Sequence, residues 1–168
     1  MAFRFDRAVA ALRYEGEARD LVHHLKFRRR APVAATLGTL LAARAVAAGV
    51  EADVVVPVPL AWRRRLARGF NQAALIAEVV ARGLNRPLRR RVLRRVGGGE
   101  PQATRTGSDR RRLGRASFAV RRPRAVRGRR VLLVDDVMTT GATASRCADL
   151  LKTAGAASVT VAVASRSV

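Results

Sequence analysis

VLLVDDVMTTGAT, residues 131–143, is the stretch of sequence that decides the fold. An apolar run predicts a buried strand at Arg130–Val134, two carboxylates follow where that strand leaves the sheet, and a turn of small residues comes next. We expect a helix from Thr143 to Ala154 that stops at Gly155, and then a second strand over Ser158–Ala164. Strand, helix and strand at this spacing form a βαβ unit, which predicts an α/β fold built on a parallel sheet.

The turn after the first strand has the chemistry of a phosphate site. Residues 139–143 offer backbone N–H groups, three hydroxyls and a glycine that lets the backbone approach a ligand. The next helix points its N-terminus into the same space. Because Asp135 and Asp136 would repel a phosphate, we expect them to face sugar hydroxyls, with Mg²⁺ nearby. A phosphate and a diol close together describe a ribose 5-phosphate.

A simpler interpretation treats the two acids as a turn or helix-capping pair and the threonines as plain turn residues. We favour the ligand site because the apolar strand, the acid pair, the Thr-Thr-Gly-x-Thr turn and the helix follow one another in order. A nucleotide-binding P-loop is excluded, since the sequence G-x-x-x-x-G-K-[ST] is not present.

The chain before this unit reads as a helical segment followed by the start of the sheet. We expect residues 1–50 to form a hood-like helical segment, with a second helix from Pro32 to Ala48, and residues 51–168 to form the core. A buried strand is predicted at Ala52–Val58, and a helix over Asn71–Leu84 and a short strand near Leu88–Leu93 follow. The apolar face of the first helix is formed by Ala18, Leu21, Val22 and Leu25.

Residues 96–130 show no sustained hydrophobic period. Gly and Arg dominate this stretch, and only Phe118–Val120 reads as a brief strand. A segment of this length without structure is usually functional or mobile. We expect its first part, about residues 96–115, to be a flexible loop that closes over the site and excludes water. A disordered basic loop is the alternative.

The composition allows one domain with a substantial core and a basic surface. Of the 168 residues, 49% are hydrophobic, and 34 Lys and Arg against 12 Asp and Glu give a net charge of +22. All the basic residues except Lys26 and Lys152 are Arg, which codon bias explains. Codon bias does not explain the shortage of acids, which predicts contact with polyanions and weak nucleic-acid binding at low salt.

The remaining bulk features concern location and the single thiol. No apolar run is long enough for a membrane span, and residues 1–10 carry charges where a signal peptide would be apolar. A cytoplasmic location is therefore expected. Cys147 stands at helical spacing with Ala144 and Leu151, so we interpret it as a small core residue and not as a catalytic thiol.

Residues 131–143 resemble the signature of the type I phosphoribosyltransferases. The resemblance implies a twisted, mainly parallel sheet flanked by helices, and a Mg²⁺ ion held through the ligand without a cluster of protein side chains. It gives Asp135 and Asp136 the catalytic role of holding the ribose 2- and 3-hydroxyls. It assigns the 5-phosphate to the small-residue loop, Thr139, Thr140, Gly141, Ala142 and Thr143.

Further stretches resemble the ComF family of phosphoribosyltransferase-like proteins, which is linked to DNA uptake in competent bacteria. They follow the family's order between about residues 14 and 166, and the family also implies a homo-oligomer. ComF proteins typically begin with a cysteine-rich zinc ribbon that this sequence lacks, so no zinc is expected, and Gly114 stands where the family usually has Asn. The matching stretches are Tyr14 with Leu25-Lys26-Phe27, Val56-Pro57-Val58-Pro59-Leu60, Arg68-Gly69-Phe70-Asn71-Gln72, Gln102, and Arg112 with Phe118.

The remaining site residues follow partly from position and partly from this resemblance. The end of the valine-rich strand should lie at the same sheet edge as the acid pair, where a turn can offer backbone donors to a pyrophosphate. Asn71 and Gln72 are expected to contact the substrate, and the alternative for Asn71 is that it only caps the next helix. We expect pyrophosphate contacts from Pro57, Val58, Pro59, Arg68, Gln102, Arg105 and Arg112.

Two functions fit these expectations. One is an enzyme that transfers phosphoribose from 5-phosphoribosyl-1-pyrophosphate to a nitrogen nucleophile and releases pyrophosphate. The other is a non-enzymatic protein that acts in DNA uptake through nucleic-acid or nucleotide binding. A purely structural basic protein is disfavoured by the loop at 135–143. The sequence shows no obvious site for a purine or pyrimidine, so the acceptor is not predicted.

Overall fold

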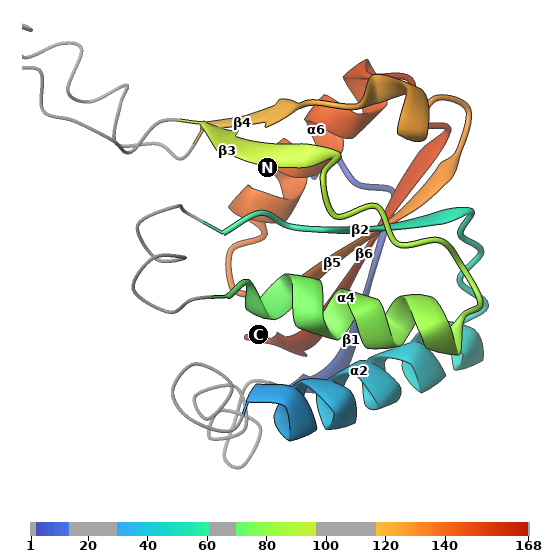
Figure 1. Ribbon diagram of the computed structural model, residues 1–168, viewed down its shortest axis with the longest axis vertical. Helices are drawn as coiled ribbons and strands as arrows, with labels where there is room; N and C mark the ends of the chain where they lie inside the picture. Colours follow the sequence, from blue (N-terminus) through green and yellow to red (C-terminus); the bar gives the residue numbers. More distant parts are fainter. Residues whose placement is uncertain (1–2, 14–29, 61–69, 97–116, 168) are drawn as a thin grey trace, which may run out of the picture.

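A four-stranded parallel sheet forms the centre of the structure (Figure 1), which is a computed structural model. The structure describes residues 3–13, 30–60, 70–96 and 117–167 of the chain. Every neighbouring pair of strands in this sheet is parallel, which confirms the predicted sheet type. The strands lie in the order β1 (Arg7–Arg13), β6 (Ser158–Arg166), β5 (Arg130–Met138) and β2 (Val54–Pro57).

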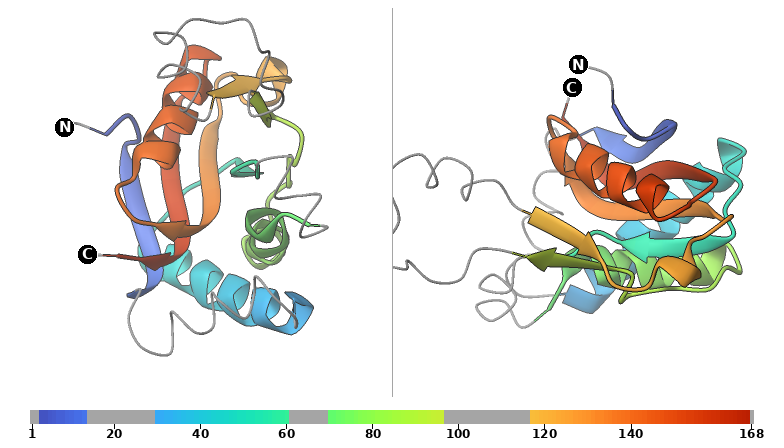
Figure 2. Two further views of the ribbon diagram at one scale, coloured as in Figure 1. Left: turned by 90° about the vertical axis from the view of Figure 1, so that its left-hand side faces the viewer. Right: turned by 90° about the horizontal axis from the view of Figure 1, so that it is seen from above.

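Helices and a hairpin cover the two faces of the sheet (Figure 2). The helices α2 (Arg30–Ala47) and α4 (Gln72–Gly83) pack on one face. The opposite face is covered by α6 (Ala142–Thr153) and by the antiparallel hairpin of β3 (Leu93–Val96) and β4 (Ser117–Val120). The result is a three-layer α/β architecture with one hydrophobic core on each side of the sheet.

The apolar run in β5 serves both cores. Successive side chains of a strand point to opposite faces. Val131 and Leu133 therefore pack beneath α6, whereas Leu132 and Val134 pack against α2 and α4. A strand that is covered on both faces needs an uninterrupted apolar run, and this is the physical reason that residues 131–134 could be read as a buried parallel strand.

Several elements lie where the sequence predicts them. The βαβ unit is present as β5, α6 and β6, and α4 begins and ends within one residue of the prediction. Cys147 is fully buried in the core beneath α6, which confirms its interpretation as a core residue. Its burial, and then the nearby charge of Asp135, raise the pKa of the thiol to about 12.

The N-terminal part of the chain corrects one expectation. Residues 7–13 form β1, so the prediction of a helical segment over residues 1–50 is wrong for this stretch. β1 pairs in parallel with β6, which supplies its backbone hydrogen bonds from residues about 150 positions away, and no local helical pattern reveals such a pairing. The predicted second helix is confirmed as α2, while the first lies outside the described residues. The division of the chain into a hood and a core stays a prediction.

The short strand predicted near Leu88–Leu93 is divided in the structure. Leu88 makes a single parallel bridge to Val55 on the free edge of β2. Arg89, Arg90 and Arg91 are exposed, and the regular strand β3 begins only at Leu93. Three consecutive charged side chains cannot alternate between a core and solvent, so the chain leaves the sheet between these two points.

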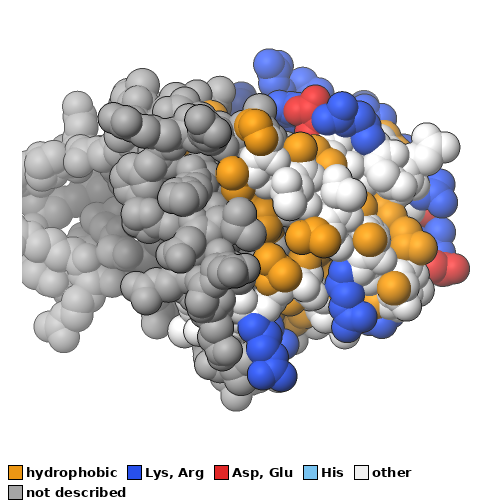
Figure 3. All heavy atoms as spheres, turned by 90° about the horizontal axis from the view of Figure 1, so that it is seen from below, with side chains coloured by type: hydrophobic (Ala, Val, Ile, Leu, Met, Phe, Trp, Pro, Cys, Tyr) orange, Lys and Arg blue, Asp and Glu red, His pale blue; other side chains and the backbone are white. Residues whose placement is uncertain are grey.

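The outer side of α2 carries exposed apolar side chains. Leu40 and Val46 are 42% and 63% exposed, and the view from the α2 side shows apolar atoms spread across this face (Figure 3). The homo-oligomer expected from the family resemblance stays a prediction.

Across the described ranges, no helix combines the length and the apolarity that crossing a bilayer requires.

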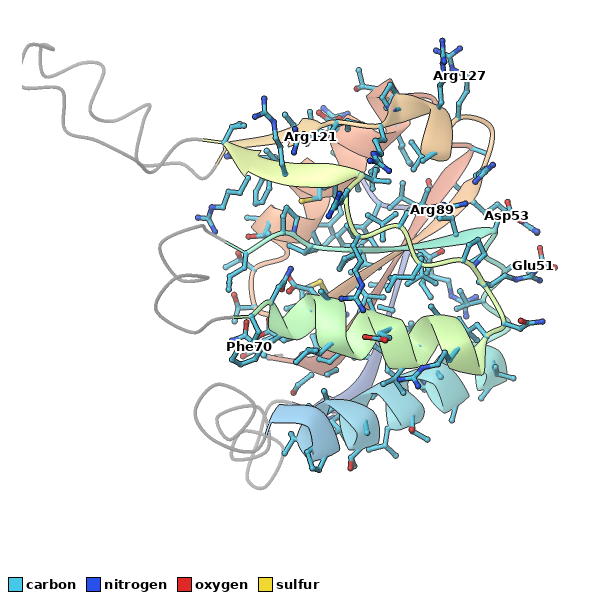
Figure 4. The ribbon with its side chains drawn as sticks, in the orientation of Figure 1. Glu51, Asp53, Phe70, Arg89, Arg121 and Arg127 are labelled. Carbon is cyan, nitrogen blue, oxygen red and sulfur yellow. The ribbon has the colours of Figure 1, made fainter. Side chains whose placement is uncertain are left out.

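A charged cluster joins β2 and β5 at their amino ends. The carboxylate of Asp53 accepts hydrogen bonds from Arg130 through its backbone N (2.8 Å), Nε (3.2 Å) and NH2 (2.8 Å). These bonds to Arg130 lower the pKa of Asp53 to about 2. Glu51 also pairs with the guanidinium of Arg130 at an exposed position (Figure 4). The side-chain contacts reinforce the backbone bond from Asp53 N to Arg130 O.

We predict that Asp53→Asn lowers stability in a pH-dependent way. The folded-state pKa lies below the ordinary value, so the ionised carboxylate stabilises the fold above about pH 4 and this contribution is lost as the pH falls towards about 2. The difference in urea midpoint between wild type and variant should therefore be largest at neutral pH and shrink between about pH 4 and pH 2. Glu51→Gln is the control and should change the midpoint little, because its ion pair is exposed. A difference that stays constant down to pH 2 contradicts this role for Asp53.

Candidate functional site at the β5–α6 turn

β5 continues past the point where its neighbour β2 stops. The last β2 pair is Pro57 with Val134, and the N–H of Val58 then donates to Val134 O at 2.8 Å. Because the N–H of Val55 donates to Pro87 O on the other side of β2, the nitrogens of Pro57 and Pro59 also face away from β5, and the prolines remove donors from that outer edge. On its other side β5 stays paired with β6 as far as Met138. The carboxyl-terminal part of β5 is therefore a strand with a single described neighbour.

This arrangement corrects the predicted position of the acid pair. Asp135 and Asp136 lie within β5 and do not follow its end, because β6 is equally long and keeps pairing with Asp135, Val137 and Met138. The strand thus extends four residues beyond Val134. Only the pairing of β5 with β2 ends at Val134. The two acids therefore lie just where β5 changes from two neighbouring strands to one.

Asp135 lies in a partly buried position beside the turn. Its Oδ1 accepts a hydrogen bond from the backbone N of Asp136 at 2.9 Å. Loss of hydration, followed by the nearby carboxylate of Asp136, raises the pKa of Asp135 well above its ordinary value. A carboxyl with a raised pKa is a stronger candidate for a functional group than a solvated surface acid. Burial disfavours its ionised form, so its protonation is sensitive to a ligand that binds nearby.

Asp136 takes a different place from Asp135. Its Oδ1 accepts a hydrogen bond from the backbone N of Val137 at 2.9 Å. It is partly buried, but it is not among the residues that line the pocket at the turn, whereas Asp135 is. Both acids thus also accept a bond from the next backbone N–H, which is the behaviour that the simpler turn-pair interpretation expects. The two carboxylates also interact with each other, which contributes to the raised pKa of Asp135.

The turn itself is open to solvent at most of its expected phosphate-binding residues. Thr139, Thr140, Ala142 and Thr143 are exposed. Gly141 is buried and adopts a φ of 70°, a left-handed conformation that favours glycine. A Cβ placed at Gly141 would lie 2.7 Å from the ring of Phe3, so the N-terminal residues cover the turn on one side.

The start of α6 leaves backbone donors next to the turn. Gly141 is the N-cap, and no side chain makes a capping hydrogen bond there. The N–H of Ala142 makes a long contact of 3.4 Å to Thr140 Oγ1. The first N–H groups of a helix have no acceptor within the helix, and the helix dipole adds partial positive charge at this end. This is the local chemistry that attracts a phosphate dianion.

A small pocket of about 60 Å³ brings these groups together. It is lined by Asp135, by all five expected phosphate-binding residues and by apolar side chains of β5, β6 and α6. A volume of this size suits one anionic group and not a whole phosphoribosyl ligand, so the rest of such a ligand would extend outwards over the exposed side of the turn.

The residues expected to contact the substrate lie where β2 meets α4. Asn71 occupies the N-cap position of α4, but its side chain makes no capping bond, and its Nδ2 donates to Val58 O at 3.0 Å. Gln72 is only 2% exposed, and its Nε2 has no hydrogen-bond partner among the residues that the structure describes. Such an unpaired buried donor costs about 1–3 kcal/mol and needs an explanation.

Ser165 is a further polar residue that the sequence analysis did not single out. Its side chain is fully buried, its Oγ has no hydrogen-bond partner within the described ranges, and it pairs with Val137 next to the acids. A serine after the apolar run in β6 is the only signal in the sequence. Four other expected contacts, Arg68, Gln102, Arg105 and Arg112, lie outside the described residues, as does nearly all of the loop at about 96–115.

The number of acidic side chains at the site limits how a metal ion could be bound. Within the described ranges, no three His, Cys, Asp or Glu side chains come together in a way that could hold an ion. Carboxylate oxygens are donors that Mg²⁺ prefers, and Asp135 and Asp136 offer such oxygens on adjacent residues. The residues present therefore fit an ion that takes most of its ligands from a bound diphosphate and water.

Comparison with known proteins places the chain in a family. Residues 66–166 match the family model described as phosphoribosyl transferase domain. The chain is 35% identical over 162 residues to the DNA utilization protein YhgH of Escherichia coli strain K12, covering 94% of this chain and 70% of that protein. It is 39% identical over 109 residues to the competence protein ComFC of Bacillus subtilis strain 168, covering 63% of this chain and 41% of that protein.

A solved structure agrees with these relatives. The fold is similar to that of the glutamine phosphoribosylpyrophosphate amidotransferase from B. subtilis complexed with ADP and GMP, with a TM-score of 0.61 and 25% identity. The similarity covers 86% of this chain and 30% of that chain. By its fold, its family match and its relatives, the chain belongs to the ComF family of phosphoribosyltransferase-like proteins.

Proposed function

We propose that the β5–α6 turn binds 5-phosphoribosyl-1-pyrophosphate or a related phosphoribosyl ligand, and that the protein transfers phosphoribose to a nitrogen nucleophile. The observation that carries this proposal is the pocket shared by Asp135 and the five turn residues. An acid with a raised pKa, three threonine hydroxyls and uncapped helix N–H groups meet at the carboxyl edge of a parallel sheet, where α/β folds bind their ligands.

The turn would hold the 5-phosphate. The backbone N–H groups at the start of α6 and the hydroxyls of Thr139, Thr140 and Thr143 donate hydrogen bonds to its oxygens. Gly141 keeps the backbone in the left-handed conformation that this turn requires. Because Thr139, Thr140 and Thr143 are exposed, a phosphate reaches them without rearrangement of the core.

The two acids would hold the ribose. Their oxygens accept hydrogen bonds from the 2- and 3-hydroxyls, and their negative charge stabilises the positive charge that develops at the first carbon of the sugar. The bond between this carbon and the pyrophosphate oxygen breaks, the pyrophosphate leaves with the electron pair, and the nucleophile's lone pair forms the new bond. No side chain acts as the nucleophile. Asp135 and Asp136 would add carboxylate oxygens to a Mg²⁺ ion held mainly through the ligand, and this ion would supply positive charge against the leaving pyrophosphate.

A second candidate is a non-enzymatic role in DNA handling. The relatives are named for DNA utilization and competence, and the chain carries a net charge of +22. In this case the fold would bind a phosphoribosyl nucleotide as a signal, or would bind nucleic acid, without turnover. The two candidates differ in one property, which is the release of pyrophosphate.

For ligand binding, we predict that Thr140→Val with Thr143→Val weakens the affinity for 5-phosphoribosyl-1-pyrophosphate at least about tenfold. A hydrogen bond to a charged group contributes about 1.5–3 kcal/mol, and 1.4 kcal/mol corresponds to a factor of ten. Titration calorimetry with Mg²⁺ measures this change. The matched control is Thr153→Val, which removes an exposed hydroxyl from the last turn of the same helix and should leave the affinity unchanged. Equal affinities of all three proteins would place the ligand elsewhere.

For turnover, we predict that wild type releases pyrophosphate from 5-phosphoribosyl-1-pyrophosphate only when Mg²⁺ and a suitable nucleophile are present. The panel should contain purines, pyrimidines and ammonia, since the acceptor is unknown, and a coupled pyrophosphate assay gives the readout. Asp135→Asn with Asp136→Asn should abolish the release, because the charge that stabilises the developing cation is lost. Tight ligand binding by wild type without release for any nucleophile would instead favour the non-enzymatic role.

For Gln72, we predict that Gln72→Met separates a ligand contact from a structural role. Methionine has a similar length and removes the unpaired Nε2, so the free energy of unfolding should stay the same or rise, by up to about 1 kcal/mol. If the amide donates to the ligand, the affinity for 5-phosphoribosyl-1-pyrophosphate falls in the same variant. Chemical denaturation and calorimetry measure the two quantities. A loss of stability with unchanged affinity would show that Gln72 only supports the fold.

A further inference from the structure

A hollow of about 820 Å³ lies on the free-edge side of β2, away from the β5–α6 turn. One wall is the stretch after α4, with Arg89, Arg90 and Arg91. The other is the stretch after β4, with Arg121, Arg122 and Arg124, and Arg129 stands at its end. We name this hollow the arginine groove. Arg89 and Arg121, one from each wall, are labelled in Figure 4.

Backbone hydrogen bonds fix the walls of the arginine groove. Arg89 N donates to Val55 O at 2.8 Å, which holds the first wall to β2. Arg121 N donates to Val92 O at 2.7 Å, which holds the two walls together. The second wall then turns through the 3-10 helix η1 (Pro123–Ala125), where NH1 of Arg129 donates to Ala125 O. The two walls are thus joined to β2 and to each other by main-chain bonds, and only the contact of Arg129 depends on an arginine side chain.

The positive charge of the groove is largely uncompensated within the described part of the chain. No acidic residue lines it. Arg90 pairs with Glu78, and no carboxylate is seen beside the six wall arginines other than this one. All six are exposed. Like charges that repel one another along a groove are stabilised by anions from solution, and a groove of one sign concentrates such anions.

General arginine richness does not account for the groove. Seven of its eleven lining residues are basic, whereas the chain as a whole has 34 Lys and Arg among 168 residues. A biased genome spreads arginine over the surface and has no reason to place it on two facing walls without acids. The enrichment is local, so it needs a local cause.

The shape and chemistry of the groove select a long anion. A single phosphate could engage only part of two facing rows of arginines, whereas a chain of repeated phosphates can engage both. A second hollow of about 500 Å³ shares Leu88 with the groove and is lined by Arg82 and Arg86, together with Glu78, the partner of Arg90. No aromatic ring lines the groove, and its floor is aliphatic, so it offers no platform for stacked bases. Contacts of this kind recognise phosphates and carry no sequence information.

We infer that the arginine groove binds the phosphodiester backbone of a nucleic acid, independently of base sequence. This site is distinct from the proposed phosphoribosyl site, because the groove and the pocket at the β5–α6 turn share no lining residue, and it gives the nucleic-acid binding of the second candidate function a place on the molecule. One chain would then hold a phosphoribosyl ligand at the carboxyl edge of its sheet and a nucleic acid beyond the edge strand β2.

The test compares two triple variants of the full chain that lose the same charge. The groove variant is Arg121→Ala, Arg122→Ala and Arg124→Ala. The control is Arg7→Ala, Arg13→Ala and Arg44→Ala, which removes exposed arginines from β1 and α2, outside the groove. Fluorescence anisotropy with a labelled duplex and a labelled single strand, each of about 20 nucleotides, gives the affinity from about 50 to 200 mM salt. Thermal melting confirms that both variants fold.

The groove variant should bind at least about tenfold more weakly than wild type, and the control less than about threefold. The slope of log affinity against log salt should fall by about 0.9 for each phosphate contact that is lost. Equal weakening by the two variants, or none by either, overturns the inference. Calorimetric loss of pyrophosphate binding in the groove variant, with duplex and single-strand binding unchanged, would also overturn it and mark a small-anion site. Asp135→Asn should retain nucleic-acid binding, which separates this outcome from a failure of the proposed function.

Discussion

The unequal lengths of the two strands that flank β5 set the geometry on which the candidate site depends. β2 pairs with β5 only as far as Val134, while β6 keeps β5 in the sheet for four more residues. Asp135 is consequently held in a regular strand, close to the sheet, instead of on a mobile loop. The ladder with β6 fixes its backbone, and the next residues turn directly into α6. A rigid acid beside an uncapped helix start is the arrangement that ligand binding requires.

Much of this could be predicted from the sequence, because the signals are local. The unbroken apolar run at residues 131–134, the glycine that starts α6 and the valines of β2 each have a direct physical meaning. The turn chemistry likewise indicated which residues to expect around a phosphate, and the structure gathers all five of them with Asp135 around one pocket. The roles given to these residues go beyond geometry and rest on the proposed function.

The rest depends on partners that are distant in the sequence. β1 is a strand because it pairs with β6, and the residues of β1 alone do not predict this pairing. The exact end of β5 follows from the length of β6, and the link from Asp53 to Arg130 spans 77 positions. The arginine groove depends on distant partners in the same way, because one wall comes from a stretch predicted as a short strand and the other from the stretch without a hydrophobic period. From the sequence alone, each charged stretch is interpreted as solvated surface. Only the fold shows that two such stretches face each other.

The raised pKa of Asp135 helps to explain how one small pocket can contain a carboxyl group and also accept a phosphate. Two full negative charges in contact would oppose binding, but burial already disfavours the ionised form of this carboxyl. On the proposed function, the raised pKa makes Asp135 easier to protonate than an ordinary aspartate, which eases the approach of a phosphate to the turn. Ribose hydroxyls and a Mg²⁺ ion would shift the pKa of this carboxyl in the opposite direction. Ligand binding would thus favour the negative charge that a developing sugar cation needs.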